Sequence, residues 1–553
     1  MIVVKRITKR NIVMSLWLVL GLTLAPAHAQ NWQDEPEVRQ QLHQLGLELA
    51  LADVHPQITQ WWQQATTPST ASEQADDRLL LGLQSFWRQW AKLSFNDRQY
   101  LRTRQLPLII SDIDEANLHS AKALGERSQL VQRLTPGYGD HEQLVAQLTR
   151  LLALTEQAWP SLPRETLRPN DYHAQIPQIR ERLQWLGDMP QGSLNAIPEQ
   201  VQLEVELDAL SVPSTVELTE EAWSEPHNEL SELDFDIEEP ELELPSRSQL
   251  SSPLPAPLMR DPQRYDEDLA AGVKRFQARH GLTVDGVIGA QTYAWLNTPP
   301  LQRAQLLMRS MLRTLIGDDL PSSYMLVNIP EYHLRLYQNQ ALVFESNVIV
   351  GQNKRKTPIM ASKITSVVFN PPWNVPRSII NKDILPKLAR DPYYLDRQGF
   401  EVLDNSGTHI IPREEWQTRF EEGGGFPYRL RQRPGRGNAL GAYKFHLPNN
   451  DAIYLHDTPG RGLFARDSRA FSSGCVRVEG AEQLADWLLH DQLSSARLSA
   501  LKANPETKWV KVKQALPLYM VYWPGWLGEN GQPQFRNDIY GFDNGITSPF
   551  KAG

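Results

Sequence analysis

Cys475 is the side chain with the most distinctive chemistry in this chain, because it is the only cysteine among 553 residues. It lies in the stretch 471–478, where Ser473 and Gly474 leave room around the sulfur and favour a turn. A lone thiol can be a reactive group, half of a disulfide between two chains, or a small buried hydrophobe. The reactive group is favoured, because an exported chain that keeps an oxidisable thiol needs a chemical reason for it.

A thiol attacks a carbonyl as its thiolate, so Cys475 requires a base and hydrogen-bond donors for the oxyanion that forms. His456 is the predicted base, because it ends the apolar strand 453–456 and precedes Cys475 in the same β-rich region. His446, on the preceding predicted strand, is the alternative base, and a structural role for His456 is the other alternative. Asp457 would face away from the imidazole, so we expect a turn residue there and a backbone carbonyl as the group that orients His456.

Arg477 follows Cys475 by two residues, so on a strand the two side chains would share one face. A guanidinium group binds a carboxylate through two parallel hydrogen bonds. We therefore expect Arg477 to bind a substrate carboxylate, and an ion pair within the protein is the alternative.

These residues occur in segments that closely resemble the active-site signature of the L,D-transpeptidases of the YkuD type, in particular the large periplasmic members of the YcbB/LdtD type. The spacing of nineteen residues between His456 and Cys475 fits that family. One departure is Ser473, where most members have histidine and the large members have serine. The matching segments are 454–459 and 472–477, with support from Thr357 and Pro358, 370–376 and 440–445.

The resemblance implies a reaction. Cys475 would attack the carbonyl of the third residue of a tetrapeptide stem, a meso-diaminopimelate, and His456 would protonate the departing D-alanine. The amine of a second diaminopimelate would resolve the thioester into a 3→3 crosslink, whereas water would give carboxypeptidase activity. The resemblance further implies backbone donors for the oxyanion near Gly474, with Ser473 as support or as packing, and substrate contacts from Tyr454 and Trp373. It implies carbapenem sensitivity, with no metal and no cofactor.

Charge and composition indicate the cellular compartment of the protein and the kinds of partner that it binds. The formal net charge of −9 comes from one stretch, 199–243, which holds 16 acidic and no basic residues, so the rest of the chain carries about +7. Without the four basic residues that open the chain, the folded part is near neutral, which argues against nucleic acid. Residues 1–29 predict an export signal: basic residues, an apolar run, then Ala27 and Ala29 before the cleavage point. We therefore expect a periplasmic protein of a Gram-negative envelope, with peptidoglycan stem peptides and other wall-synthesis enzymes as partners.

The expected fold class is multidomain α+β, with a helical scaffold, a small helical peptidoglycan-binding module, and a mixed-β catalytic domain that carries a lid. The module resembles the peptidoglycan-binding domain through its first helix 176–187, the pair Phe276 and Gln277, and the loop 285–289. The expected boundaries are signal peptide 1–29, scaffold 30–170, module 171–298 with an acidic disordered insertion 191–257, connector 299–322 and catalytic domain 323–553, with the lid at about 376–437.

Three other classes are weighed against this interpretation. A papain-like protease is disfavoured, because the cysteine block of that family is missing and His456 precedes Cys475. A zinc peptidase would need a paired-histidine helix motif, which the sequence lacks. A wall-binding protein without catalysis would make Cys475 incidental. Beyond the site, 508–512 and 519–523 predict two more strands, and 535–541 predicts an ordered tail without a derived role.

Overall fold

The computed structural model describes residues 31–139, 141–190, 261–316 and 320–543. The predicted export signal and the acidic insertion 191–257 lie outside these residues. The described chain begins with a helical scaffold in which several helices start at a proline, which has no N–H to leave unpaired, or at a capping serine such as Ser72 or Ser111, whose side chain accepts a free N–H. The scaffold helices are α1 (Pro36–Leu51), α2 (Pro56–Thr66), α3 (Glu73–Lys92), α4 (Phe95–Gln99), α5 (Asp112–Leu124), α6 (Arg127–Gln132) and α7 (His141–Ala153).

A three-helix module follows the scaffold and consists of α8 (Ile176–Trp185), α9 (Glu267–Arg279) and α10 (Ala290–Leu296). Gln277 organises its loop, because its side-chain amide donates to Asp285 Oδ1 (2.9 Å) and its side-chain oxygen accepts the N–H of Gly286 (2.9 Å). Gly286 has φ +77°, a conformation that favours glycine. The motif that carried the resemblance therefore has a structural function in this loop.

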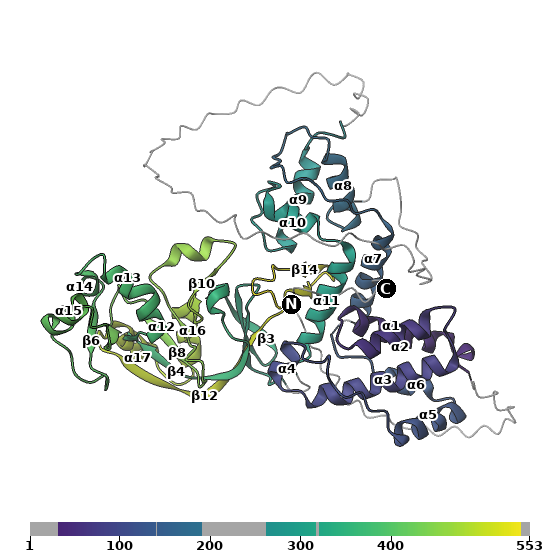
Figure 1. Cartoon of the computed structure of the whole chain (residues 1–553), viewed down its shortest axis with the longest axis horizontal. Coiled ribbons are helices and arrows are strands. Elements are labelled where there is room, and N and C mark those ends of the chain that lie inside the picture. The colour runs from purple at the N-terminus through teal and green to yellow at the C-terminus, as the bar shows by residue number, and fades with distance from the viewer. Residues whose placement is uncertain (1–30, 140, 191–260, 317–319, 544–553) are drawn as a thin grey trace.

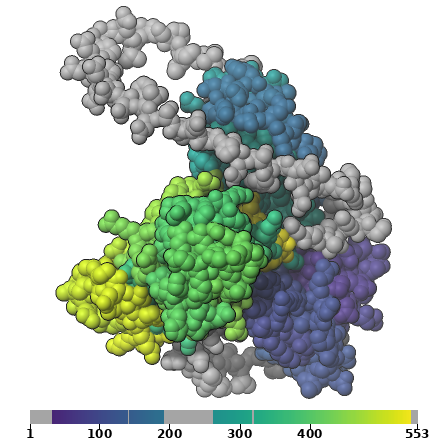
Figure 2. Space-filling view, turned by 60° about the vertical axis from the view of Figure 1, so that its left-hand side comes forward, coloured from purple at the N-terminus to yellow at the C-terminus, as the bar shows by residue number. Residues whose placement is uncertain are grey.

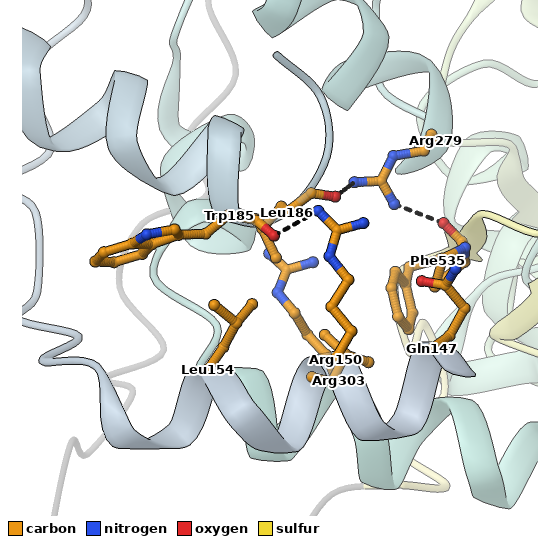
Figure 3. A pocket seen from close by; sticks show the side chains of 10 residues that line it. Gln147, Arg150, Leu154, Trp185, Leu186, Arg279, Arg303 and Phe535 are labelled. Carbon is orange, nitrogen blue, oxygen red and sulfur yellow. Dashed lines mark hydrogen bonds between the residues drawn. The ribbon is translucent and has the colours of Figure 1, made fainter. Parts of the chain in front are cut away.

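The scaffold, the module and the connecting helix α11 (Pro300–Thr314) share one continuous apolar core. Figure 3 shows their junction, where Arg150 donates to the Trp185 carbonyl (2.8 Å) and Arg279 to the Pro533 carbonyl (2.7 Å). Arg303 donates to Nε2 of the buried His280 (2.8 Å). The cavity among these side chains has a volume of about 10 Å³, room for about one water, so the arginines serve as structural ties. No helix in the described part of the chain is both long and apolar enough to cross a membrane.

The catalytic domain is built on a nine-stranded mixed sheet that closes on itself, because β2 also pairs with β3. The hairpin between these two strands turns at Asn339 and Gln340, both with positive φ, as is common in short hairpin turns. In sheet order the strands are β10 (Ala470–Ser472), β3 (Ala341–Gly351), β11 (Val476–Val478), β9 (Leu455–His456), β8 (Tyr443–His446), β4 (Met360–Phe369), β12 (Lys508–Val521), β1 (Tyr324–Asn328) and β2 (His333–Gln338).

Strand β12 corrects one expectation, because the two strands predicted near the C-terminus are a single strand of 14 residues. Its pairing with β4 shifts register between Lys511 and Leu516, so a bulge absorbs the polar stretch that suggested a break. Helices α16 (Ala481–Leu489) and α17 (Ser495–Ala503) cover the core of this sheet, and β13 (Gly525–Leu527) and β14 (Pro533–Phe535) form a separate hairpin. The predicted fold class, helical domains together with a mixed-β catalytic domain, is confirmed.

The segment predicted as a lid, which we continue to call the lid, is a subdomain inserted between β4 and β8 with a small apolar core of its own. It projects at the end of the molecule opposite the scaffold in Figure 1, and it forms the green front surface in Figure 2. Its elements are β5 (Trp373–Asn374), α12 (Arg377–Ile379), a π-helical turn (Ile380–Ile384), α13 (Leu385–Leu388), α14 (Tyr394–Arg397), β6 (Phe400–Leu403), α15 (Arg413–Glu421) and β7 (Arg429–Gln432), with the strands in the order β5-β7-β6.

The C-terminal tail is anchored to helix α11 by a buried ion pair. Asp543 accepts hydrogen bonds from both terminal nitrogens of Arg313 (2.7 Å each) and from Arg309 Nε (2.7 Å). Burial opposes ionisation of Asp543, yet the charges and hydrogen bonds of the two arginines outweigh it and lower the pKa of Asp543 to about 2. The pair therefore stabilises the fold above the ordinary carboxyl pKa, and this stability is lost as the pH falls from about 4 through about 2.

We expect Asp543→Asn to lower the free energy of unfolding at neutral pH by about 3–5 kcal/mol, because it leaves the buried guanidinium of Arg313 without its counter-charge. Urea unfolding followed by circular dichroism measures the loss. Glu506→Gln, which removes the exposed partner of Lys508, is the control and should leave the urea midpoint unchanged. Equal midpoints for Asp543→Asn and the wild type would contradict the anchoring role of this pair.

Candidate active site

Cys475 lies in the tight loop between β10 and β11, half-buried and without a disulfide partner. Gly474 has φ +116°, which a side chain at this position would strain. The N–H of Gly474 donates to Ser472 Oγ (3.1 Å), and Ser472 Oγ donates to the Cys475 carbonyl (2.6 Å). The Gly474 N–H is therefore occupied within the loop, whereas the Cys475 N–H has no partner among the described contacts. The predicted oxyanion donor at Gly474 is thus engaged within the loop, and the neighbouring N–H of Cys475 is the one left unpaired among the described residues.

The carbonyl of Gly474 is fixed from the other side by residues that the sequence alone did not connect to the loop. Thr357 Oγ1 donates to this carbonyl (2.7 Å) and accepts the N–H of Gly351 (2.8 Å). Tyr540 in the C-terminal tail accepts the Thr357 N–H (2.9 Å) and donates to the Gly351 carbonyl (2.6 Å). The tail, whose role could not be derived from sequence, thus supports the cysteine loop.

Three neighbouring strands place charged or titratable side chains in one row across the sheet. His456 on β9 pairs with Lys444 on β8 and with Arg477 on β11. Directly paired residues project to the same face, with Cβ atoms about 5 Å apart, so His456 lies between two cations. The adjacent row, Phe445, Leu455 and Val476, is buried in the core on the opposite face.

His456 is held as a neutral base. Its Nδ1 donates to the backbone carbonyl of Asp457 (2.5 Å), and because a carbonyl only accepts, the ring proton is on Nδ1 and Nε2 carries the lone pair. Burial, the largest cause, and the charges of Arg477 and Lys444 lower the pKa of His456 to about 3. The hydrogen bond to the Asp457 carbonyl opposes this shift. The imidazole is therefore neutral at neutral pH, with the lone pair of Nε2 unprotonated.

The side chain of Asp457 turns away from the imidazole, as strand alternation predicted. Its carboxylate accepts the N–H of Ala442 (2.8 Å) and a hydrogen bond from Arg461 (2.8 Å). Gly441 has φ +61°, and a Cβ at that position would overlap the Asp457 carboxylate. Asp457 therefore shapes the turn before β8, and its backbone carbonyl orients the base.

The thiol of Cys475 is predominantly protonated at rest, because burial raises its pKa. A hydrogen bond from the Tyr454 hydroxyl and the charges of Lys444 and Arg477 oppose this effect and favour the thiolate once it forms. The Trp373 side chain on the lid strand β5 also influences the pKa of Tyr454, which places this strand beside the site. Among the described contacts no hydrogen bond joins His456 to Cys475, as is common for catalytic pairs before substrate binds.

Arg477 is half-buried, and its Nε has no hydrogen-bond partner in the structure. No carboxylate among the described residues forms an ion pair with it. Burial lowers the pKa of Arg477, and the opposing charge is that of the Cys475 thiolate. A desolvated cation without a counter-charge is costly, so this geometry favours an anionic ligand over the alternative of an internal ion pair.

The side chain of Ser473 faces the lid. Arg355 donates to Ser473 Oγ (2.8 Å) and forms an ion pair with Asp383 in the π-helical turn (2.5 Å). Together with the contact between Trp373 and Tyr454, this connects the lid to both sides of the cysteine loop. The structure therefore gives Ser473 a lid contact that the sequence did not suggest.

His446, the alternative base, lies elsewhere on β8. It pairs with Ser366 and packs edge-on against the exposed ring of Trp509, 5.6 Å between ring centres. No described contact joins it to Cys475. The residues that the sequence analysis missed are Lys444, Arg355 and Tyr540. Lys444 lies within the matching segment 440–445, but its pairing with His456 cannot be seen from the sequence.

Comparison with known proteins identifies the family of the sheet domain. Residues 322–511 match the model of the L,D-transpeptidase catalytic domain, YkuD. The chain contains a YkuD-family catalytic domain. Residues 255–296 match the model of the peptidoglycan-binding domain, PG_binding_1. The catalytic domain and the peptidoglycan-binding module predicted from the sequence motifs are therefore confirmed, and the size of the chain fits the large members of the YkuD type.

A curated relative of the YkuD domain is consistent with this assignment. A Haemophilus influenzae protein that carries the provisional name of L,D-transpeptidase is 46% identical over 223 residues, which are 40% of this chain and 45% of that protein. The match thus spans a little under half of the relative's length. A solved structure, the Ldtfm-avibactam carbamoyl enzyme, aligns with 36% of this chain and 49% of that chain at 9% identity, and its TM-score of 0.18 is too low to support any argument.

Proposed function

We propose that this protein is an L,D-transpeptidase that forms 3→3 crosslinks between meso-diaminopimelate residues of peptidoglycan. His456 takes the proton of the Cys475 thiol, and the thiolate attacks the carbonyl of the third residue of a tetrapeptide stem. The C–N bond then breaks, His456 returns the proton to the departing D-alanine amine, and a thioester remains. The amine of a second diaminopimelate attacks the thioester and loses its proton to His456. The C–S bond breaks, and the proton returns to Cys475.

The observation that carries the proposal is the row of Lys444, His456 and Arg477 beside a half-buried cysteine. A neutral imidazole can act as base at neutral pH, and the free N–H of Cys475 can stabilise the oxyanion. Arg477 is placed to bind a carboxylate of the donor stem. Trp373 and Tyr454 would form part of the wall against which the stem lies.

The assignment of compartment is part of the proposal. The sequence of residues 1–29 is that of an export signal, and peptidoglycan lies outside the inner membrane, so we place the enzyme in the periplasm. The module matched to a peptidoglycan-binding domain would hold the enzyme near its polymeric substrate and raise the local concentration of stems. Other wall-synthesis enzymes are proposed as partners on the same ground.

Product analysis tests the proposal and separates it from the two alternatives. The protein is incubated with purified disaccharide-tetrapeptide, and the products are identified by mass spectrometry. Crosslinking yields a dimer together with one D-alanine, and fragmentation places the new bond between two diaminopimelates. A disaccharide-tripeptide as the dominant product would instead indicate an L,D-carboxypeptidase. Unchanged substrate, with protein bound to sacculi, would indicate a wall-binding protein without catalysis.

A further inference from the structure

Lys444 is a cation in the site, and the proposed reaction as described above does not use it. Its ammonium group lies 4.1 Å from the centre of the Tyr454 ring and acts on the thiol of Cys475. No carboxylate among the described residues pairs with Lys444, whereas Lys502 on α17 is paired with two. Lys444 is half-buried, so it keeps its charge at a cost in solvation without a protein counter-ion.

The order of the strands indicates which part of a substrate would reach Lys444. Cys475 adjoins β11, His456 is on β9, and Lys444 is on β8, so the base lies between the nucleophile and the lysine. The acyl carbon is bonded to the sulfur of Cys475, and the amine that leaves or attacks must meet His456. The carbon substituent of that amine, on the side away from the acyl group, therefore extends toward Lys444.

Both amines of the proposed reaction carry the same group at that position. The leaving group is D-alanine, and the attacking amine belongs to the D-centre of meso-diaminopimelate, so each nitrogen is attached to a D-configured carbon that bears a carboxylate. Attack on the thioester retraces the path by which the first amine left, so one cation beside His456 can bind this carboxylate in both half-reactions.

We propose that Lys444 binds the α-carboxylate of the D-amino acid centre whose amine leaves or attacks, and thereby selects D-α-amino acids as leaving groups and acceptors. The inference rests on the proposed transpeptidase function. Arg477, on the strand of the nucleophile, remains for a carboxylate on the acyl side. The cation–π contact between the Lys444 ammonium and the Tyr454 ring keeps the ammonium at the site.

The test is a competition between two acceptors that differ only in the carboxylate. The full-length enzyme is acylated with disaccharide-tetrapeptide in the presence of equal D-methionine and D-methioninamide, and the two products are quantified by mass spectrometry. We expect the wild type to favour the acid by roughly 10- to 100-fold, the range for a hydrogen bond between charged groups. Lys444→Met should lower this ratio at least about tenfold through a higher KM for D-methionine, with the KM for the amide unchanged.

Two further variants keep the test specific. Lys444→Arg retains the charge and should retain most of the preference for the acid. Lys363→Met, which removes an exposed lysine from the neighbouring strand β4, should leave the ratio at the wild-type value. A preference that survives in Lys444→Met would overturn the inference and leave the transpeptidase function intact. A wild type that transfers to neither acceptor and forms no crosslink would overturn the proposed function itself.

Discussion

Replacing Cys475 with alanine is expected to abolish crosslinking, with a loss in kcat of at least about 10⁴-fold, because no other nucleophile can form the acyl intermediate. The fold should be largely unaffected, since the side chain of Cys475 is half-buried at the edge of the core and the hydrogen bond that it donates, to the Ala452 carbonyl, is long at 3.8 Å. The measurement is the yield of 3→3 dimer from disaccharide-tetrapeptide, with the urea midpoint as a check on folding. Dimer formation by Cys475→Ala at the wild-type rate would exclude the proposed mechanism.

The same variant gives a direct test of the thioester. A carbapenem acylates a nucleophilic thiol by opening its lactam ring, so the wild type should gain the full mass of the drug in an intact-mass spectrum and Cys475→Ala should gain none. Ser473→Ala is the matched control, because it changes the neighbouring side chain and removes the contact to Arg355 without touching the sulfur. We expect this control to form the adduct. An adduct on Cys475→Ala would place the reactive group elsewhere in the chain.

The features that the sequence predicted are those encoded by neighbouring residues. The turn role of Asp457 and the closeness of Cys475 to Arg477 each follow from alternation or turn preference over a few positions. A cysteine without a partner and a histidine at a strand end are likewise local signals. The sequence could therefore propose which groups carry the chemistry.

The features that the sequence missed depend on strand register and on contacts between distant segments. Lys444 and His456 are twelve positions apart, and only the antiparallel register of β8 and β9 makes them neighbours. Tyr540 reaches the cysteine loop through Thr357, 183 positions earlier in the chain. A single strand with a bulge, such as β12, cannot be told from two strands by periodicity, because the bulge breaks the alternation.

Replacing His456 with asparagine is expected to lower kcat for crosslinking by about 10²–10⁴-fold, the range for general acid–base catalysis. Asparagine can keep the hydrogen bond to the Asp457 carbonyl with its side-chain amide, and it removes the base at Nε2. Both acylation and transfer should slow, since one imidazole moves the proton in each step. A burst of D-alanine release at the wild-type rate, followed by slow transfer, would show that His456 acts in the second step alone.

The protonation states of the site give this variant a second, independent readout. His456, with a pKa lowered to about 3, is neutral above pH 4, and the pKa of Cys475 is raised, so the resting pair is thiol and imidazole. Alkylation by iodoacetamide requires only the thiolate, and its rate should rise about tenfold per pH unit between pH 6 and 9. His456→Asn should alkylate within a few-fold of the wild type while crosslinking falls. A rate that is flat across this range would mean an ion pair at rest.

The depressed pKa of His456 also makes the stability of the fold depend on pH in a defined direction. An unfolded chain protonates this histidine near pH 6.5, whereas the folded protein keeps it neutral down to about pH 3. The unfolded state therefore binds more protons in this window, and the free energy of unfolding contributed by this group decreases as the pH falls from 6.5 toward 3. His456→Asn should lose less stability than the wild type between pH 7 and 5 in urea unfolding, whereas equal losses would mean that the imidazole is already protonated in the fold.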